Sequence, residues 1–203
     1  MNGLAHATKR GFDIAASAAG LIVTAPALAA AAIAIKLEDG GPVLYRQERV
    51  GRDGRPFCIL KLRSMVVDAE HTGAGLAVNT GDSRITRIGA FLRRTSLDEL
   101  PQLVNILRGE MSVVGPRPTL RYQVEQYDAV QRRRLEVRPG VTGWAQIHGR
   151  ASLPWDERIR LDVWYVDHAS LLLDLRILAR TPRTLLRRDA LYKGEGGGWT
   201  GAS

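Results

Sequence analysis

The most informative stretch of this chain is residues 14–35, IAASAAGLIVTAPALAAAAIAI. It contains no charged side chain, so it can be buried in a protein core or in a membrane. A straight helix of this length would be roughly 33 Å long, close to the thickness of the hydrocarbon core of a bilayer. The run is longer than the apolar core of a usual secretory signal, and a basic chain follows it directly. Three interpretations remain: a helix buried in a protein core, a single membrane span, and a re-entrant helix that enters and leaves on one side.

Two features of this run favour a re-entrant helix. Pro26 lies near its middle, where proline removes a helical hydrogen bond and clashes with the preceding turn, and Thr24 can help to accommodate a bend. Both flanks are basic, with Lys9 and Arg10 before the run and Lys36 after it. Because positive charge favours the cytoplasmic side of a membrane, basic residues at both ends favour a hairpin-like path.

The sequence divides into three parts. Residues 1–40 carry the apolar run, residues 41–193 have the mixed composition of a globular domain, and residues 194–203 form a glycine-rich tail that we expect to be flexible. Asp13, at the edge of the run, is expected to pair with Lys9 or Arg10 rather than to face lipid.

The net charge of +8 over 203 residues indicates an anionic partner. Nucleic acid, an anionic membrane surface and a phosphorylated substrate all fit, and charge alone does not separate them. Cys58 is the only cysteine, which excludes an intrachain disulfide. The four histidines have no metal-ligand spacing, and the sequence contains neither a P-loop nor a G-x-G-x-x-G motif after a strand.

The soluble part is predicted to be mainly helical with a small β-hairpin. Apolar strands at residues 43–45 and 57–60 flank a Gly-Arg-Asp-Gly turn at residues 51–54. Leucines and a valine at positions 100, 103, 104 and 107 predict a helix that Gly109 ends. Residues 171–187 form a basic amphipathic helix, which suits either a membrane interface or packing on its own domain. The predicted class is α+β, mainly helical, with a re-entrant membrane helix, interfacial amphipathic helices and the hairpin.

Residues 96–99, Ser-Leu-Asp-Glu, have two interpretations. They match a capping box, with Ser96 as the N-cap and Glu99 at N3, while Asp98 complements the helix dipole. Alternatively, the two acids are catalytic. A helical wheel places Asp98 with Gln102 and Asn105, so Asp98 is expected to point away from the core and Glu99 to lie at its border. Because adjacent helical positions differ by about 100°, unequal roles are expected: one acid attacks or binds metal, and the other supports it.

Cations flank these acids on both sides. Arg93 and Arg94 precede them, and Gly-Pro-Arg-Pro at residues 115–118 holds Arg117 between two prolines. A guanidinium fixed in this way matches phosphate oxygens, although a surface turn with an exposed arginine is the simpler interpretation. Residues 138–146, RPGVTGWAQ, form a second rigid stretch whose spacing has no common catalytic meaning.

Several segments together resemble the bacterial sugar transferase family, the small monotopic phosphoglycosyl transferases. The matching segments are residues 9–14, 41–43, 61–65, 95–103, 112–118, 138–146 and 162–166. They run in order over nearly the whole chain, which is far more specific than one motif, and they favour the catalytic interpretation of residues 96–99. Mild departures are Leu62, Val104 and His148, where this family more often carries Phe, an aromatic residue and Asn.

The resemblance implies a two-step reaction at the cytoplasmic face of the bacterial inner membrane. Asp98 would attack the β-phosphate of a UDP-sugar, release UMP and carry a covalent phosphosugar, which polyprenyl (undecaprenyl) phosphate would accept. Glu99 would support Asp98, and Lys61 and Arg117 would bind substrate phosphate. Mg²⁺, with Asp98 as its ligand, would neutralise charge, and Pro26 would break the membrane helix. The expected partners are the UDP-sugar, polyprenyl phosphate and membrane lipid, and not nucleic acid.

Two other functions remain as alternatives. A non-catalytic, membrane-tethered basic protein that binds lipid or nucleic acid would explain the charge and the apolar run, but not two acids within a cation-rich stretch. A diphosphate hydrolase with the same pair of acids would release free sugar phosphate without needing the lipid.

Overall fold

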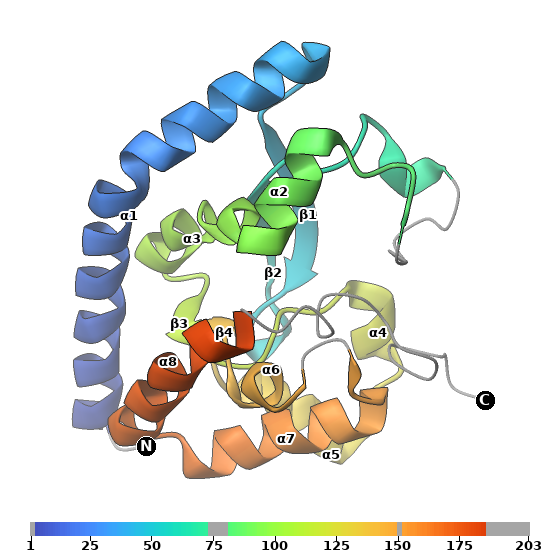
Figure 1. Cartoon of the computed structure of the whole chain (residues 1–203). Coiled ribbons are helices and arrows are strands. Elements are labelled where there is room, and N and C mark those ends of the chain that lie inside the picture. Colours follow the sequence, from blue (N-terminus) through green and yellow to red (C-terminus); the bar gives the residue numbers. More distant parts are fainter. Residues whose placement is uncertain (1–2, 73–80, 150–151, 186–203) are drawn as a thin grey trace.

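The computed structural model describes residues 3–72, 81–149 and 152–185, so the expected flexible tail at residues 194–203 lies outside the described part. Helices predominate, and the strands form two small two-stranded sheets (Figure 1). The predicted class, α+β and mainly helical, is confirmed. The elements are α1 (Gly3–Asp39), β1 (Leu44–Val50), η1 (Arg52–Gly54), β2 (Pro56–Leu62), η2 (Ala69–His71), α2 (Arg87–Thr95), η3 (Leu97–Glu99), α3 (Gln102–Arg108), β3 (Ser112–Val114), α4 (Arg121–Glu125), α5 (Ala129–Arg132), η4 (Arg133–Glu136), β4 (Gly140–Thr142), α6 (Trp144–His148), α7 (Trp155–His168) and α8 (Leu171–Leu185).

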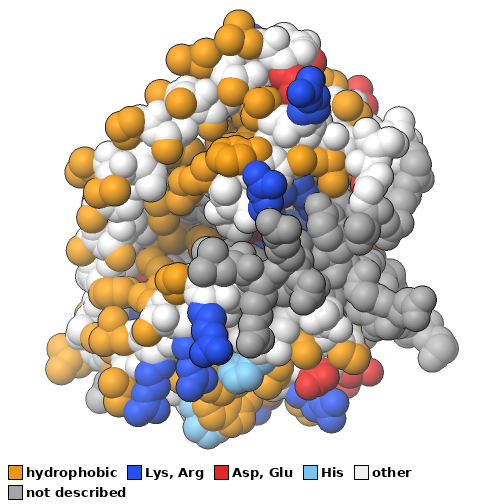
Figure 2. Space-filling model, in the orientation of Figure 1, with side chains coloured by type: hydrophobic (Ala, Val, Ile, Leu, Met, Phe, Trp, Pro, Cys, Tyr) orange, Lys and Arg blue, Asp and Glu red, His pale blue; other side chains and the backbone are white. Residues whose placement is uncertain are grey.

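The apolar run forms most of α1, which lies along one side of the molecule (Figure 1). The helix is long and apolar enough to cross a membrane, yet only 11% of its most apolar 18-residue stretch is buried inside the protein. Figure 2 shows hydrophobic side chains along the outer side of α1, at the left edge of the view. A core helix would be mostly buried, so the core interpretation is wrong and the helix associates the protein with a membrane.

Helix α1 continues through Pro26 and changes direction partway along its length (Figure 1). Pro26 has no N–H to donate to the Ile22 carbonyl, whereas Thr24 Oγ1 donates to the Gly20 carbonyl at 2.6 Å. The expected break is therefore a bend within an unbroken helix, which runs from Gly3 to Asp39 with Pro26 inside it. The re-entrant path through a membrane and the domain division at residue 40 stay predictions.

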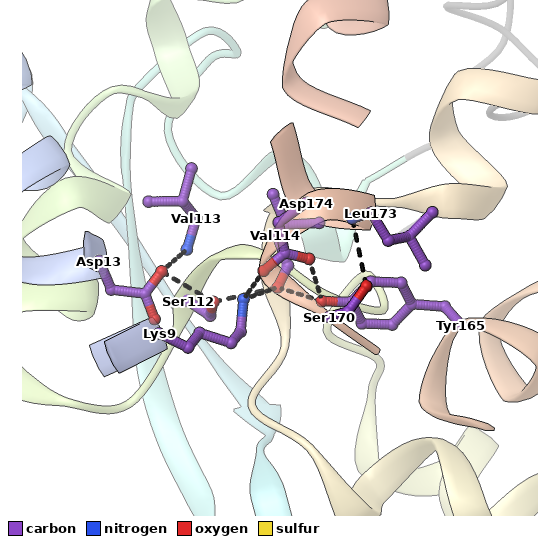
Figure 3. A network of polar contacts seen from close by, with 9 residues as sticks. All are labelled: Lys9, Asp13, Ser112, Val113, Val114, Tyr165, Ser170, Leu173 and Asp174. Atoms are coloured by element: carbon purple, nitrogen blue, oxygen red, sulfur yellow. Dashed lines mark hydrogen bonds and ion pairs between the residues drawn. The ribbon is translucent and has the colours of Figure 1, made fainter. Parts of the chain in front are cut away.

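A buried polar network docks α1 on the rest of the chain (Figure 3). Asp13 accepts hydrogen bonds from Ser112 Oγ and from the Val113 backbone N–H, both at 2.9 Å. Lys9 Nζ lies 2.5 Å from Oδ2 of Asp174 in α8. Since these groups come from α1, β3 and α8, the network fixes three separate elements against one another.

The expected pairing of Asp13 with Lys9 or Arg10 is wrong. Lys9 reaches Asp174 instead, and Arg10 donates to the carbonyls of Ile106 and of the next residue, at the end of α3. Asp13 and both cations thus find partners far away in the sequence, because docking of α1 brings β3, α3 and α8 within reach.

The predicted hairpin is confirmed and is longer than expected. Strands β1 and β2 pair antiparallel from Leu44↔Leu62 to Val50↔Pro56. The connecting turn has the left-handed conformation at Asp53, with φ of 56°. One side of the hairpin packs its apolar residues on α3, and the other side carries polar residues toward a pocket. The hairpin is therefore the platform of the candidate site.

The two glycine- and proline-rich stretches pack on each other as the parallel pair β3 and β4. A Cβ atom added to Gly140 would lie 2.1 Å from the Gly115 nitrogen, and one added to Gly115 would lie 2.4 Å from the Arg138 carbonyl oxygen. Only glycine permits this backbone approach. Residues 138–146, for which spacing indicated no role, thus support the loop that carries Arg117.

Helix α8 buries one side and exposes another. Leu173 and Ile177 pack with Tyr165 in a buried cluster, whereas Leu172 and Leu175 are 61% and 47% exposed. Figure 2 shows basic side chains over α8, near the lower left of the view. The helix therefore packs on its own domain and still presents an apolar and basic side, and its contact with a membrane stays a prediction.

Candidate active site

Asp98 and Glu99 lie in the tight turn η3, between α2 and α3. Ser96 ends α2 in the left-handed conformation, and Pro101 precedes α3, where a missing N–H removes no helical hydrogen bond. Leu97 packs in the cluster formed by α1, β2 and α2, which anchors the turn. Because a 3₁₀ turn has about three residues per turn, the two adjacent carboxylates point in different directions.

The capping-box interpretation of residues 96–99 is wrong. The Ser96 side chain makes no capping hydrogen bond, and its backbone N–H already bonds to the carbonyls of Leu92 and Arg93 at the end of α2. The Glu99 carboxylate contacts cations instead. The left-handed conformation of Ser96 thus serves to end one helix rather than to begin the next.

Glu99 is held between two cations from distant parts of the chain. Lys61 Nζ of β2 lies 2.9 Å from Glu99 Oε1, and Arg117 Nη2 lies 2.5 Å from the same oxygen. Arg117 Nη1 also lies 3.4 Å from Oε2. Burial alone would raise the pKa of Glu99, but Arg117 and Lys61 hold it well below its usual range. Glu99 is therefore ionised, and its charge balances part of the charge of both cations.

Asp98 has a different environment. Its side chain is buried among protein atoms and lines the pocket, and within the described residues its carboxylate makes no direct hydrogen bond or ion pair. Burial, followed by the negative charge of Glu99, raises the pKa of Asp98 to about 6, against the opposing effect of Lys61, Arg93 and Arg117. An ionised carboxylate with no direct partner is suited to act as a nucleophile or a metal ligand.

The expectation that Asp98, Gln102 and Asn105 face away from the core is wrong. Gln102 is 1% exposed and Asn105 is 0% exposed. The Asn105 amide accepts from the Leu60 N–H at 3.1 Å and donates to the Cys58 carbonyl at 2.8 Å. The polar side of α3 thus packs on β2, where the strand edge supplies hydrogen-bonding partners that a helical wheel does not include.

A pocket of about 480 Å³ opens in front of Asp98. Its walls are the polar side of the hairpin, residues 63–71 and Arg93. On one wall the Tyr45 hydroxyl donates to Glu70 Oε1, and Gln47 Nε2 donates to Glu70 Oε2 at 3.4 Å. The size lies in the range of small-molecule sites, and the lining is richer in cations than in acids. The pocket therefore suits an anionic ligand of moderate size.

A second, smaller pocket of about 200 Å³ lies on the other side of η3, beside Glu99. Its lining is mostly apolar and comes from η3, α3, β4, α6 and α8. The turn that carries both acids thus separates a pocket with many charged side chains from a pocket in which Glu99 is the charged lining residue.

The residues present are compatible with a magnesium ion that the substrate helps to hold. Within the described ranges, no cluster of three or more His, Cys, Asp or Glu side chains could hold a metal ion. Mg²⁺ commonly binds through one or two carboxylates together with substrate phosphates and water. Of the two neighbouring acids, Asp98 is the one free to do so, because Glu99 is already paired with Lys61 and Arg117.

The structure brings the four predicted site residues together: Asp98, Glu99, Lys61 and Arg117. Binding of phosphate by Lys61 and Arg117 and of metal by Asp98 stays a prediction. Sequence reasoning gave no site role to the pocket wall formed by Tyr45, Gln47 and Arg49 of β1. Their alternation along a strand is a period-two signal that could have placed them on one face.

Comparisons with known proteins identify the family to which the chain is similar. The model of the family described as "Bacterial sugar transferase" matches residues 4–188. "Uncharacterized sugar transferase EpsL" of Bacillus subtilis is 43% identical over 91% of this chain and 90% of its own length. "UDP-N-acetylgalactosamine-undecaprenyl-phosphate N-acetylgalactosaminephosphotransferase" of Aeromonas hydrophila is 45% identical over 88% of this chain but only 43% of its own length. "UDP-glucose:undecaprenyl-phosphate glucose-1-phosphate transferase" of Caulobacter vibrioides is 45% identical over 91% and 72%.

Proposed function

Because the chain belongs to the bacterial sugar transferase family, we propose that it transfers a sugar 1-phosphate from a UDP-sugar to polyprenyl (undecaprenyl) phosphate and releases UMP. One observation carries this proposal: the unpaired carboxylate of Asp98 faces a cation-rich pocket beside the Glu99 cluster. The names of two relatives contain both a UDP-sugar and undecaprenyl phosphate, which supports these substrates. The relatives name different sugars, so the proposal covers the substrate class and no particular sugar.

In the first step, a carboxylate oxygen of Asp98 attacks the β-phosphorus of the donor. The bond from that phosphorus to the oxygen bridging the α-phosphate breaks, and UMP leaves with the electron pair. Asp98 then carries the phosphosugar as an acyl phosphate. In the second step, a phosphate oxygen of the polyprenyl carrier attacks the same phosphorus, restores the Asp98 carboxylate and forms a polyprenyl diphosphate sugar. Two easier displacements thus replace one direct transfer.

Glu99 and its cations support this chemistry without attacking the substrate. Lys61 and Arg117 place positive charge next to the carboxylate that must approach an anionic diphosphate. The negative charge of Glu99 keeps both side chains in position and helps to hold the pKa of Asp98 near 6, where it is ionised at neutral pH. Mg²⁺, with Asp98 as its protein ligand, would neutralise charge on the diphosphate.

We place the active site at the cytoplasmic face of the bacterial inner membrane, where the proposed water-soluble donor and lipid acceptor can meet. The exposed apolar side of α1 and the basic, apolar side of α8 support a position at a membrane surface. A re-entrant path for α1 would keep both of its ends on the same side as the pocket.

The decisive experiment measures UMP release by the detergent-solubilised full chain with a panel of UDP-sugars, polyprenyl phosphate and Mg²⁺. We expect release with at least one donor and loss of release on chelation of the metal. Free sugar phosphate formed without the lipid would instead indicate a hydrolase. No UMP release with any donor would favour a non-catalytic binding protein.

Asp98→Asn is expected to reduce UMP release by at least a thousandfold, because an amide cannot form the acyl phosphate. Its thermal unfolding midpoint at pH 7.5 should equal or exceed that of the unsubstituted chain, since burial disfavours the charged form of Asp98. With donor alone, mass spectrometry should find the phosphosugar on Asp98 of the unsubstituted chain only. A variant with unchanged turnover would exclude Asp98 as the nucleophile.

A further inference from the structure

In the described part of the chain, three arginines that line the pocket have no acid bound to them: Arg46, Arg49 and Arg93. Arg49 differs from the other two in having a buried side-chain nitrogen without a hydrogen-bond partner. Lys61 and Arg117 both contact Glu99, and Arg63 is paired with Asp39. In the described part of the chain, Arg49 forms no salt bridge, and its Nε is buried without a hydrogen-bond partner. Its contact is a hydrogen bond from Nη2 to the neutral side chain of Gln47. An enclosed guanidinium without a carboxylate is unfavourable until an anion binds it.

The position of Arg49 directs this charge to the pocket of Asp98. Arg49 lies on the same side of β1 as Tyr45 and Gln47, and all three line the pocket that Asp98 also lines. The next residue along, Val50, donates its backbone N–H to the Thr119 carbonyl at 2.9 Å. This bridge ties the end of β1 to the loop that carries Arg117.

The electrostatic environment agrees with the geometry. Burial and then the nearby charge of Arg117 lower the pKa of Arg49 to about 10, while Glu70 acts in the opposite direction. Arg49 remains protonated at neutral pH but carries a charge that its surroundings only partly compensate. A ligand that supplies negative charge at this point would restore the balance.

We propose that Arg49 binds the diphosphate of the nucleotide donor, as a cation separate from the pair held by Glu99. This inference rests on the proposed function, because it assumes that the pocket holds a nucleoside diphosphate sugar. The planar guanidinium can donate two parallel hydrogen bonds to phosphate oxygens. Lys61 and Arg117 then act mainly beside Asp98, while Arg49 holds the donor from the opposite strand of the hairpin.

The test compares the binding of UDP and of uridine to the detergent-solubilised full chain, in the presence of Mg²⁺ and without lipid. Arg49→Gln should weaken UDP binding by about tenfold or more, because a charge-assisted pair is lost, and should leave uridine binding unchanged. The affinity of Arg49→Lys for UDP should lie between that of Arg49→Gln and that of the unsubstituted chain. Lysine keeps the positive charge but loses the pair of parallel donors of the guanidinium. The KM for the UDP-sugar should rise in parallel, with no change in the KM for polyprenyl phosphate.

Arg52→Gln is the matched control. It removes the same charge from the same hairpin, but Arg52 is exposed and contacts Asp53 at 3.3 Å in the turn. Its UDP binding should equal that of the unsubstituted chain. If Arg49→Gln does not fold, the test uses Arg49→Lys. An affinity of Arg49→Lys for UDP equal to that of the unsubstituted chain would overturn the inference.

The outcomes separate this inference from the proposed function. If the unsubstituted chain binds UDP and releases UMP, while Arg49→Gln binds UDP equally well, only the role of Arg49 is overturned. If Arg49→Gln weakens uridine as much as UDP, Arg49 shapes the pocket and does not bind phosphate. If the unsubstituted chain neither binds UDP nor releases UMP, the proposed function itself fails.

Discussion

At the scale of single residues, two neighbouring acids have opposite electrostatic environments. Glu99 is ionised because Arg117 and Lys61 contact it, whereas Asp98 has no direct partner in the described residues and a pKa raised to about 6 by burial and by Glu99. Pairs of titratable groups whose pKa values are driven apart are typical of catalytic sites. The contrast gives each acid a separate, testable role.

The pKa of Asp98 predicts the pH dependence of the reaction. Asp98 attacks only as a carboxylate, so kcat/KM for the UDP-sugar should fall as the pH is lowered through about 6. The fall should approach roughly tenfold per pH unit well below that value. UMP release measured between pH 5 and 8.5, with protein stability followed in parallel, checks this expectation. A flat profile across that range would contradict the assignment of Asp98.

The folded-state pKa of Asp98 also has a consequence for stability. Its pKa is raised above the ordinary 3.8, so the folded state favours the protonated form. The stabilisation from Asp98 is therefore present below about pH 3.8 and is lost as the pH rises through about 6. This sign explains why Asp98→Asn should be no less stable than the unsubstituted chain at pH 7.5.

Glu99→Gln is expected to impair both stability and turnover. It leaves Lys61 and Arg117 without their shared carboxylate, which should reduce the free energy of unfolding by about 1–3 kcal/mol. Loss of the negative charge should also lower the pKa of Asp98, so the acidic limb of the pH profile should move to lower pH.

If Glu99 had a purely structural role, Glu99→Gln would not shift the acidic limb of the pH profile. Glu48→Gln is the control, because Glu48 forms an exposed pair with Arg121 at 3.4 Å that should contribute little. If the activity lost in Glu99→Gln is fully explained by the unfolded fraction, with no shift in the profile, Glu99 has no direct role in the reaction.

At the scale of elements, α1 is the helix whose path in a membrane most needs a direct measurement. We expect Leu4→Cys and Leu37→Cys, each made in a Cys58→Ser background, to react with an impermeant maleimide from the same side of sealed vesicles. Both side chains are well exposed, at 79% and 81%. Val23→Cys, also exposed in the absence of lipid, should be protected from the reagent. Labelling of the two ends from opposite sides would show that α1 spans the membrane.

At the scale of the whole molecule, the buried network of Figure 3 joins α1 to the catalytic part of the chain. Lys9→Met should lower the free energy of unfolding by about 3–5 kcal/mol, because it leaves the fully buried Asp174 without its cation. The double variant Lys9→Met with Asp174→Asn should recover part of this loss. Thermal unfolding in detergent measures both effects.

Arg133→Met is the control for this network. Arg133 pairs with Asp167 on the surface, and both side chains are about two-fifths exposed. Its unfolding midpoint should therefore change little. If Lys9→Met is as stable as this control, the network does not hold α1 in place.

The sequence by itself determined the local features. An uncharged run with a central proline gave a long, bent helix, turn residues between two apolar segments gave the hairpin, and ordered motifs gave the family. It also identified Asp98, Glu99, Lys61 and Arg117, which converge in the structure. Local periodicity and turn chemistry act over a few residues, so they can be recognised without the fold.

Only the tertiary structure decided where each of these side chains points and which partner it finds. A helical wheel predicted that the Asp98 side chain points away from the core. In the structure, the left-handed backbone conformation of Ser96 and the tight turn η3 place that side chain in the lining of the pocket. Asp13 accepts a hydrogen bond from Ser112 of β3. Glu99 forms ion pairs with Lys61 of β2 and with Arg117. Arg49 becomes distinctive only in the folded chain, where its Nε is buried and has no hydrogen-bond partner among the described residues. These outcomes depend on contacts between segments far apart in the chain, and packing alone brings such segments together.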